Sequence, residues 1–423
     1  MRLVELTMQD FEDFAQNHPL RNYCQSTKYA KVMGEKGYSY DYIGYKDDSN
    51  NLIAASLVLI KKIGPFHKFA YAPKGFLIDY YNSEILKLFI KDFCAHYKKR
   101  GVVFIKINPE IIIGELLASN GFMPNYNQNV SIIDTLKDLN FKRRREIFPL
   151  DFIMPRISAY IDLKKFDPQK LSDDYKNKIK SFNKKGFSFL NYESKEINVL
   201  YNIIKPHSYE TINYFRNILN IFNNNESELF LIKMDHQLAL VNAQKRYQKE
   251  MNDNSYWNEM IQRDNSEKNL KEKMESDKRL LAYKEEMVVA TENLKRVESE
   301  FIGGALVVKY KNRVSIIACG FKDDTQFLSP ESYLYYSLIE RYRNDFDFLD
   351  LNGLASNFNS DSKYYNYNKD KLAFNPTIYE FIGEFDLVLN ENSFKKIQSK
   401  GLLSKEFYPS YKLENIESEK EVQ

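Results

Sequence analysis

The sequence has few cysteines, one tryptophan and almost no net charge. Its three cysteines do not suggest a disulfide framework, and their spacing does not match a metal site. Lysine and arginine (61) nearly balance aspartate and glutamate (58), so the net charge of +3 argues against a surface that binds nucleic acid throughout. The five histidines are dispersed. We therefore expect no metal site.

Long apolar runs are also missing. No segment offers about 18 uninterrupted apolar residues, the length that a membrane-spanning helix needs. The start, "MRLVELTMQDFEDFAQNHPL", carries acidic residues where a signal peptide needs a basic and then an apolar block. The sequence therefore predicts a cytoplasmic protein that is soluble or at most peripheral to a membrane.

The chain of 423 residues is long enough for two or three domains, and it contains an internal repeat. Each copy has a strand rich in small residues, a second strand, an amphipathic helix and a further strand. The first copy reads "NLIAASLVLIKKI", "KFAYAPKGFLID", "SEILKLFIKDFCAHYKKRG" and "VVFIKINPE"; the second reads "EFIGGALVVKYKNRVSIIACGF", "PESYLYYSLIERYRND" and "FDFLDLNG". We predict two copies of one α/β module.

The second module should begin near Pro155, with a strand in "RISAYIDL". A helix follows, with Ser172 as its N-cap and Gly186 as its stop, and then strands in "FSFLNY" and "ELFLIKMD". We expect "IYEFIGEFD" to form one strand near the end of this module. The predicted boundaries are 1–150 for the first module, and 151–235 with 301–386 for the second. Residues 387–412 should pack back on the first module, and residues 413–423 should be a disordered tail.

Residues 236–300 differ from the rest of the chain and interrupt the second module. Glycine and proline are absent from residues 237–302, and residues 241–300 contain 12 basic and 13 acidic side chains. Two apolar series repeat every seven residues, which predicts a helix able to pack on a partner. They are Met274, Leu281 and Val288, and Leu280, Met287, Leu294 and Phe301. We predict an inserted arm of two antiparallel helices, a coiled-coil hairpin; a solvated structural hairpin is the alternative.

Six segments in series resemble the Fem family (FemABX), the aminoacyltransferases that build peptidoglycan interpeptide bridges. They are "QSTKYAKV", "FAYAPKGFLID", "FIKINPE", "FIGGALVVKYKNRVSII", "SYLYYSLIERYRNDFDFLDLNG" and "IYEFIGEFDLVLN", from about residue 10 to 392. The resemblance implies two acetyltransferase-like (GNAT) modules. It also implies an arm in the second module, as in members that act on lipid-linked precursors.

The resemblance further implies transfer of an amino acid of the Gly, Ala or Ser class from aminoacyl-tRNA to the stem peptide of lipid II or a related precursor. Aminoacyl-tRNA is then the co-substrate, and the site lies at the inner face of the bacterial membrane. Homo- or hetero-oligomers with Fem-like paralogues are also expected. The reaction needs two aligned substrates, a cation or N–H donors aimed at the oxyanion, and a route for a proton.

Anchored on "EFIGEFD", the family's F-K-K-G-F segment aligns with residues 370–374, so the resemblance assigns the family's functional lysine to Lys371. A lysine there stabilises negative charge on a phosphate or on the oxyanion. Lys369 matches a second basic position and is the alternative catalytic candidate. The competing interpretation is that both lysines are solvated residues of a loop.

Four positions depart from the family's pattern. Met33 stands where a phosphate-binding lysine is expected, and Asn108 replaces a carboxylate in "INPE". Glu210 replaces a basic residue, and Ala318 replaces an aromatic residue found in some relatives. The predicted substrate-binding residues are Lys31, Lys36, Lys74, Asn108, His207, Tyr209, Arg216 and Phe374.

Two other functions stay open on the sequence. The four departures are compatible with a non-catalytic partner of active Fem proteins. A GNAT-type transferase with a different acyl donor would need a Q/R-x-x-G-x-G/A loop for pyrophosphate, which the sequence does not contain. The basic cluster "KRRRE" at residues 142–146 is either a contact for tRNA or anionic lipid or a solvated linker.

Overall fold

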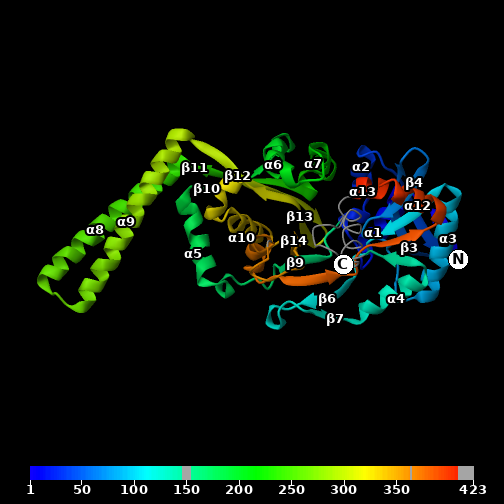
Figure 1. Ribbon diagram of the computed structural model, residues 1–423, viewed down its shortest axis with the longest axis horizontal. Helices are drawn as coiled ribbons and strands as arrows, with labels where there is room; N and C mark the ends of the chain where they lie inside the picture. Colours follow the sequence, from blue (N-terminus) through cyan, green and yellow to red (C-terminus); the bar gives the residue numbers. More distant parts are fainter. Residues whose placement is uncertain (145–153, 363, 408–423) are drawn as a thin grey trace, which may run out of the picture.

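The chain folds into two lobes, each built on a β-sheet, and a two-helix hairpin projects from the second lobe (Figure 1). The computed structural model describes residues 1–144, 154–362 and 364–407. The predicted module boundary at residues 150 and 151 and the predicted tail at 413–423 lie outside the described residues.

The first lobe has a sheet with the strand order β1-β2-β3-β4-β5-β16-β8. Successive residues of β3 enter different cores, because side chains alternate between the two faces of a sheet: Leu57 packs on one face and Val58 on the other. The strands are β1 (Arg2–Glu5), β2 (Ser39–Lys46), β3 (Leu52–Ile63), β4 (His67–Ala72), β5 (Val102–Ile107), β8 (Phe141–Arg143) and β16 (Phe385–Val388).

The second lobe has a sheet with the strand order β10-β11-β12-β13-β14-β9-β15-β6-β7. Two of its strands, β6 and β7, come from the part of the chain that precedes residue 150. The strands are β6 (Ile112–Leu116), β7 (Pro124–Tyr126), β9 (Ile157–Asp162), β10 (Phe187–Tyr192), β11 (Ser227–Asp235), β12 (Ser299–Tyr310), β13 (Arg313–Phe321), β14 (Phe348–Gly353) and β15 (Thr377–Phe381).

The two sheets confirm the internal repeat. In the first lobe β3 pairs antiparallel with β4, and β4 pairs parallel with β5 after the crossover helix α3 (Ser83–Lys99). In the second lobe β12, β13 and β14 repeat these pairings, with α10 (Pro330–Tyr342) as the crossover. Parallel neighbours require such a crossover, so each helix lies between the two strands that it joins in sequence.

Predicted elements of the second lobe also appear. The helix α5 (Asp173–Phe182) begins after Ser172, whose Oγ accepts a hydrogen bond from the Tyr175 N–H. Gly186 follows with φ +78°, a left-handed conformation that favours glycine at a helix end. The strands predicted in "FSFLNY" and "ELFLIKMD" are β10 and β11.

The prediction of one strand in "IYEFIGEFD" is wrong, because the segment crosses between the sheets. β15 belongs to the second sheet and β16 to the first. Gly383, with φ +87°, lies between them, and the left-handed backbone there breaks the extended run. The chain crosses beside the β5–β6 connection, where the Ile382 N–H donates to the Ile111 carbonyl at 2.8 Å.

A shared hydrophobic core joins the lobes. It combines Phe11, Tyr29 and Phe69 of the first lobe with Phe215 and Phe222 of α7 (Ile212–Glu226) in the second. The remaining helices of the lobes are α1 (Met8–Asn17), α2 (Thr27–Glu35), α4 (Ser131–Asp138), α6 (Ile197–Ile204), α11 (Tyr365–Leu372), α12 (Glu391–Ser399) and α13 (Leu402–Glu406). Ile397 of α12 and Leu403 of α13 pack into this core.

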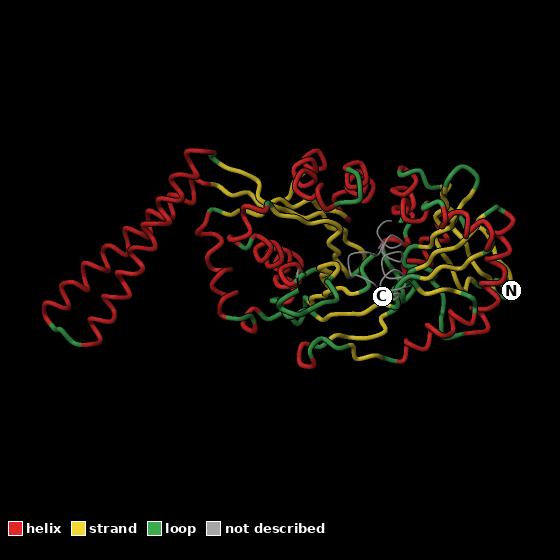
Figure 2. Tube along the Cα trace, viewed as in Figure 1, coloured by secondary structure: helices red, strands yellow, loops and turns green. Residues whose placement is uncertain are grey.

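The hairpin consists of α8 (His236–Arg263) and α9 (Glu267–Arg296), which lie against each other and are closed by a short loop (Figure 2). It leaves the second lobe between β11 and β12. None of the described helices combines the length and the apolar character needed to cross a membrane.

Candidate functional site

A cleft of about 1360 Å³ lies between the two lobes. Its first wall includes α2 and the turn after β4, which contribute Met33 and Lys74. Its second wall includes the end of β13, the start of α10 and the inner face of α11. The repeat therefore places the carboxyl-terminal parts of equivalent strands on opposite sides of one cavity, where two substrates can be held against each other.

The cleft contains half of the residues predicted from sequence. Its lining includes Lys36, Lys74, His207, Tyr209 and Lys371. The other five lie elsewhere: Lys31 and Lys369 are exposed, Asn108 is buried behind the turn at Lys74, Arg216 bonds to Asn198 and Asn213, and Phe374 is 1% exposed in the second core.

Lys371 lies on the inner face of α11 and is only 3% exposed. Its ammonium donates to the Gly353 carbonyl at 2.6 Å and lies 3.5 Å from the Tyr367 hydroxyl and 4.4 Å from the centre of that ring. An ammonium has three N–H donors, and contacts with described residues account for two. Lys371 is therefore a fixed, largely desolvated cation at the wall of the cleft, where an anionic group gains most from it.

Asn108 supports Lys74 from behind. Its amide oxygen accepts hydrogen bonds from the Lys74 backbone N–H at 2.9 Å and from the Tyr71 hydroxyl at 3.2 Å. Lys74 has φ +52°, a conformation that a non-glycine residue adopts only where neighbours hold it. Its ammonium lies 4.8 Å from the centre of the Phe381 ring and faces the cleft. Asn108 thus positions the turn that presents Lys74.

Three of the four departures from the family pattern meet in the cleft. Met33, Glu210 and Ala318 all line it. The Lys36 ammonium forms an ion pair with Glu210, which joins α2 of the first lobe to the loop before α7. Lys36 also lies 5.2 Å from the centre of the Tyr214 ring. The cleft therefore keeps a lysine three residues after Met33, and this lysine is paired with an acidic side chain.

A buried ion pair between Glu110, which lines the cleft, and Arg313 had no signal in the sequence. Arg313 of β13 donates to both carboxylate oxygens of Glu110, at 2.7 and 3.2 Å, and also to the Tyr160 hydroxyl at 3.2 Å. Asn22 donates to the same carboxylate. Burial acts to raise the pKa of Glu110, but Arg313 and Lys74 outweigh it and hold that pKa below its ordinary value. Glu110 is therefore an anion that fixes the lobes rather than a proton acceptor.

Two other carboxyl groups of the cleft have raised pKa values. Burial raises the pKa of Asp350, and Arg313 opposes that shift. Burial also raises the pKa of Glu331 from 4.5 to about 7, and Asp370 adds to the shift. Glu331 stands in the first turn of α10 and lines the same wall as Lys371. A carboxyl group with a pKa near neutrality can exchange protons during a reaction at cellular pH.

The basic cluster at residues 142–146 is partly used in structural contacts. Lys142 pairs with Glu391, the Arg143 Nε donates to the Ile382 carbonyl at 2.9 Å, and Arg144 lies 3.7 Å from Asp386. Residues 145 and 146 lie outside the described residues. These contacts favour a structural role for the described part of the cluster.

Within the described residues, no group of three or more His, Cys, Asp or Glu side chains could hold a metal ion.

Comparison with known proteins agrees with this architecture. Lipid II:glycine glycyltransferase of Staphylococcus aureus (strain bovine RF122 / ET3-1) is 21% identical over 415 residues, which cover 94% of this chain and 95% of that protein. The protein of the same name from strain Mu50 / ATCC 700699 has the same identity and coverage. A solved structure titled "Crystal structure of FemX" is similar with a TM-score of 0.71 and 20% identity, over 94% of this chain and 100% of that chain.

The match to a family is nearly as long as the chain. The model of the FemAB family covers residues 6–400, which include the hairpin and every strand of the two sheets except β1. The resemblance predicted from six sequence segments is thereby confirmed. This chain belongs to the FemAB family.

Proposed function

We propose that this protein transfers an amino acid from aminoacyl-tRNA to an amine on the stem peptide of a lipid-linked peptidoglycan precursor. The observation that carries the proposal is that Lys371 and Glu331 line one wall of a cleft shared by both lobes. Membership of the FemAB family and relatives named lipid II:glycine glycyltransferase support the substrate class. We propose glycine, alanine or serine as the transferred amino acid. Aminoacyl-tRNA is the co-substrate that supplies it, with no separate cofactor.

The reaction replaces an ester with an amide. The neutral amine attacks the ester carbonyl, a C–N bond forms, and the carbonyl oxygen becomes an oxyanion. Lys371 is the cation that stabilises this oxyanion. Glu331 accepts the proton that the attacking nitrogen loses, and the ribose hydroxyl of tRNA leaves with a proton when the C–O bond breaks. The Lys371 ammonium is held by the Gly353 carbonyl before substrate arrives, so little reorganisation of this cation opposes the reaction.

Two further lysines of the cleft suit the anionic parts of the substrates. Lys74 and Lys36 are point cations on the first wall, and His207 and Tyr209 lie on the second. A lipid-linked precursor carries phosphate groups, which bind ammonium groups readily. The protein would then act in the cytoplasm, at the inner face of the membrane that holds this precursor.

A transfer assay tests the proposal. Purified protein would be incubated with lipid II and with tRNAs charged with glycine, alanine, serine or leucine, and the modified precursor detected by mass spectrometry. We expect a mass increase of one amino-acid residue with at least one of the first three tRNAs. An active paralogue in parallel reactions controls for substrate quality. If that control works and this protein transfers none of them, it is a non-catalytic partner.

Glu331→Gln should lower turnover about 10- to 100-fold at pH 8, because the amide cannot accept a proton. In the unchanged protein, kcat/KM should rise with pH through about 7, where the Glu331 carboxyl ionises. The variant should lose this rise. A pH profile that persists in the variant would assign the proton transfer to another group.

The same substitution should stabilise the fold at high pH. A carboxyl group whose pKa is raised from 4.5 to about 7 contributes favourably below pH 4.5, and that contribution is lost as pH rises to 7. Glutamine avoids the loss, so the variant should be more stable by about 3 kcal/mol at pH 8 and nearly unchanged at pH 4. Thermal unfolding at the two pH values measures the difference.

Substitutions at the Lys36–Glu210 pair should change substrate binding rather than chemistry. Glu210→Gln frees the Lys36 ammonium, so KM for the precursor should fall severalfold while kcat stays within about twofold. Lys36→Ala should raise KM instead. Steady-state kinetics with varied precursor measure both. Equal effects of the two substitutions would show that Lys36 contacts no anionic part of the precursor.

A further inference from the structure

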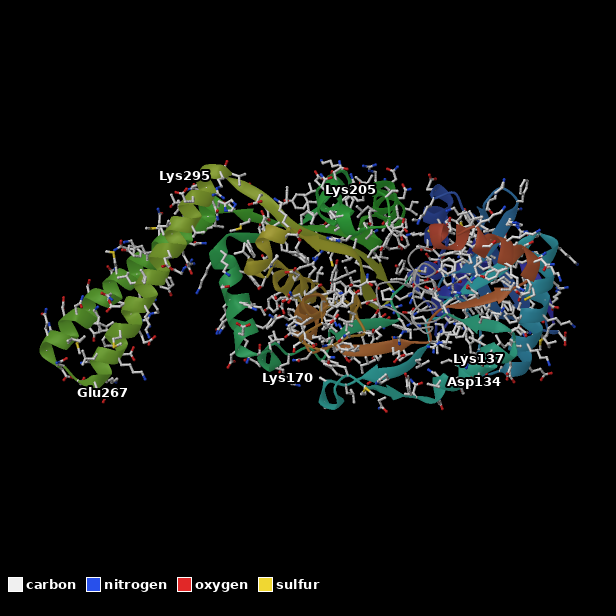
Figure 3. All side chains as sticks on the ribbon, in the orientation of Figure 1. Asp134, Lys137, Lys170, Lys205, Glu267 and Lys295 are labelled. Carbon is white, nitrogen blue, oxygen red and sulfur yellow. The ribbon has the colours of Figure 1, made fainter. Side chains whose placement is uncertain are left out.

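The outer face of α9 carries an apolar stripe that the hairpin itself does not cover. Met274, Leu281 and Val288, one of the two series spaced by seven, are 61%, 60% and 52% exposed, and Leu270 is 41% exposed. We call these four residues the outer seam. They span about 27 Å of a helix that runs from Glu267 at the tip to Lys295 near the second lobe (Figure 3). An exposed apolar series at this spacing is typical of a helix that packs on another helix.

The hairpin's own interface, in contrast, contains buried polar groups. Glu250 of α8 is 6% exposed and accepts hydrogen bonds from the Ser276 hydroxyl at 2.7 Å and the Arg279 Nε at 3.1 Å. Asn254 is 8% exposed and donates to the Ser276 hydroxyl at 3.1 Å. Burial of these groups fixes the register of the two helices. The outer seam is therefore not needed to hold α8 and α9 together.

The charged residues that flank the outer seam can pair with the same residues of a second α9. Helical spacing places Asp277 and Lys284 on one flank of Leu281, and Lys278 and Glu285 on the other. When a second α9 is laid antiparallel about Leu281, Asp277 comes beside the partner helix's lysine on the first flank. Lys278 comes beside its glutamate on the second flank, and Met274 lies opposite its valine at position 288. Opposite charges at such flanking positions select partner and orientation in helix pairs.

We propose that α9 pairs with α9 of a second copy of this chain, antiparallel, about a two-fold axis at Leu281. The pairing joins apolar seam to apolar seam, and a two-fold interface needs only this one self-complementary surface. It places the two bodies at opposite ends of the paired helices, because each hairpin extends away from its own lobes (Figure 1).

Other occupants fit the seam less well. A membrane surface favours a broad apolar face bordered by lysine and arginine. The outer seam is narrow, and Asp277, Glu285 and Glu292 lie close to it. The same carboxylates repel the phosphates of a nucleic acid. A second copy covers the apolar side chains, and its flanking charges extend the ion pairs that Asp277 forms with Lys273 and that Lys278 forms with Glu275 within one chain.

Disulfide crosslinking tests the pairing and its orientation in the full chain. A Leu281→Cys protein should form a crosslinked dimer under mild oxidation, and so should a mixture of Met274→Cys and Val288→Cys proteins. Met274→Cys alone should not form a crosslinked dimer, because antiparallel pairing separates the two copies of position 274 by about 21 Å. The unchanged chain, which keeps Cys24, Cys94 and Cys319, is the background control. Crosslinking of Met274→Cys alone would overturn the antiparallel arrangement.

Two adjacent valines supply the matched control. Val288 belongs to the outer seam, whereas Val289 is 56% exposed on a different face of the same helix. In sedimentation over a concentration series, Leu281→Gln with Val288→Gln should weaken dimerisation at least tenfold, and Leu281→Gln with Val289→Gln should weaken it clearly less. Circular dichroism checks that both variants keep their helices. A monomer at all concentrations, or binding to anionic vesicles or tRNA that depends on Val288, would reject the proposal.

Discussion

Lys371→Ala is expected to lower turnover by about 100- to 1000-fold while the fold is kept. Lys371 is 3% exposed and its ammonium is held by the Gly353 carbonyl, so in the proposed reaction it would act on the oxyanion through a medium that screens charge weakly. Alanine removes that charge and leaves the Gly353 carbonyl without its donor, which costs about 1–3 kcal/mol of stability. Single-turnover transfer with saturating precursor measures the chemical step, and thermal unfolding measures the stability.

Two further variants separate the role of Lys371 from general effects of charge. Lys371→Arg keeps a cation but changes its shape, so it should recover part of the stability and little of the rate. Lys369→Ala tests the alternative candidate, which is exposed on the same helix and should affect the rate far less than Lys371. An unchanged rate in Lys371→Ala would reject the assigned role, and a larger loss in Lys369→Ala would transfer it.

The fold was predictable where the pattern of apolar residues is local. The first copy predicts a helix from the spacing of Ile85, Leu88, Phe89, Phe93 and Tyr97. The helix is α3, in which Phe89, Phe93 and Tyr97 are buried, whereas Leu88 is 36% exposed. The second copy repeats this helical spacing of apolar residues in α10, so the same pattern locates both modules. The prediction of a single strand in "IYEFIGEFD" failed because both strands in this segment are apolar. Which sheet each strand joins is decided by pairing with distant strands and by the backbone at Gly383.

The candidate site was predictable only where a motif marks it. Lys371 could be singled out by alignment, and the structure places it in the cleft. Glu110 and Arg313 are 203 positions apart, and nothing near either residue indicates that they meet. Glu331 resembles the acidic residue that often begins a helix, and its raised pKa comes from burial that only the folded chain creates. Such groups act through their environment rather than through neighbours in sequence.

Arg313→Met is expected to destabilise the protein by about 3–5 kcal/mol, because it leaves the Glu110 carboxylate buried without a counterion. The two side chains are 18% and 9% exposed, and their closest atoms are 2.7 Å apart. The matched control is Arg343→Met. Arg343 forms an exposed pair with Glu340 at 2.8 Å, and loss of that pair should cost less than about 1 kcal/mol. The free energy of unfolding, measured with urea at pH 7, compares the two substitutions.

Replacing both Arg313 and Glu110 distinguishes the loss of their attraction from the free-energy cost of leaving one charge buried and unpaired. Arg313→Met with Glu110→Leu should recover most of the stability lost in the single variant, because the unpaired Glu110 carboxylate is removed together with the arginine. Acid provides an independent test. The pKa of Glu110 lies below its ordinary value of 4.5, so the pair stabilises the fold fully above pH 4.5 and loses its effect as pH falls through the lowered pKa. The penalty of Arg313→Met should therefore shrink in acid; a penalty that is the same at pH 7 and at low pH would assign it to lost packing of the arginine side chain.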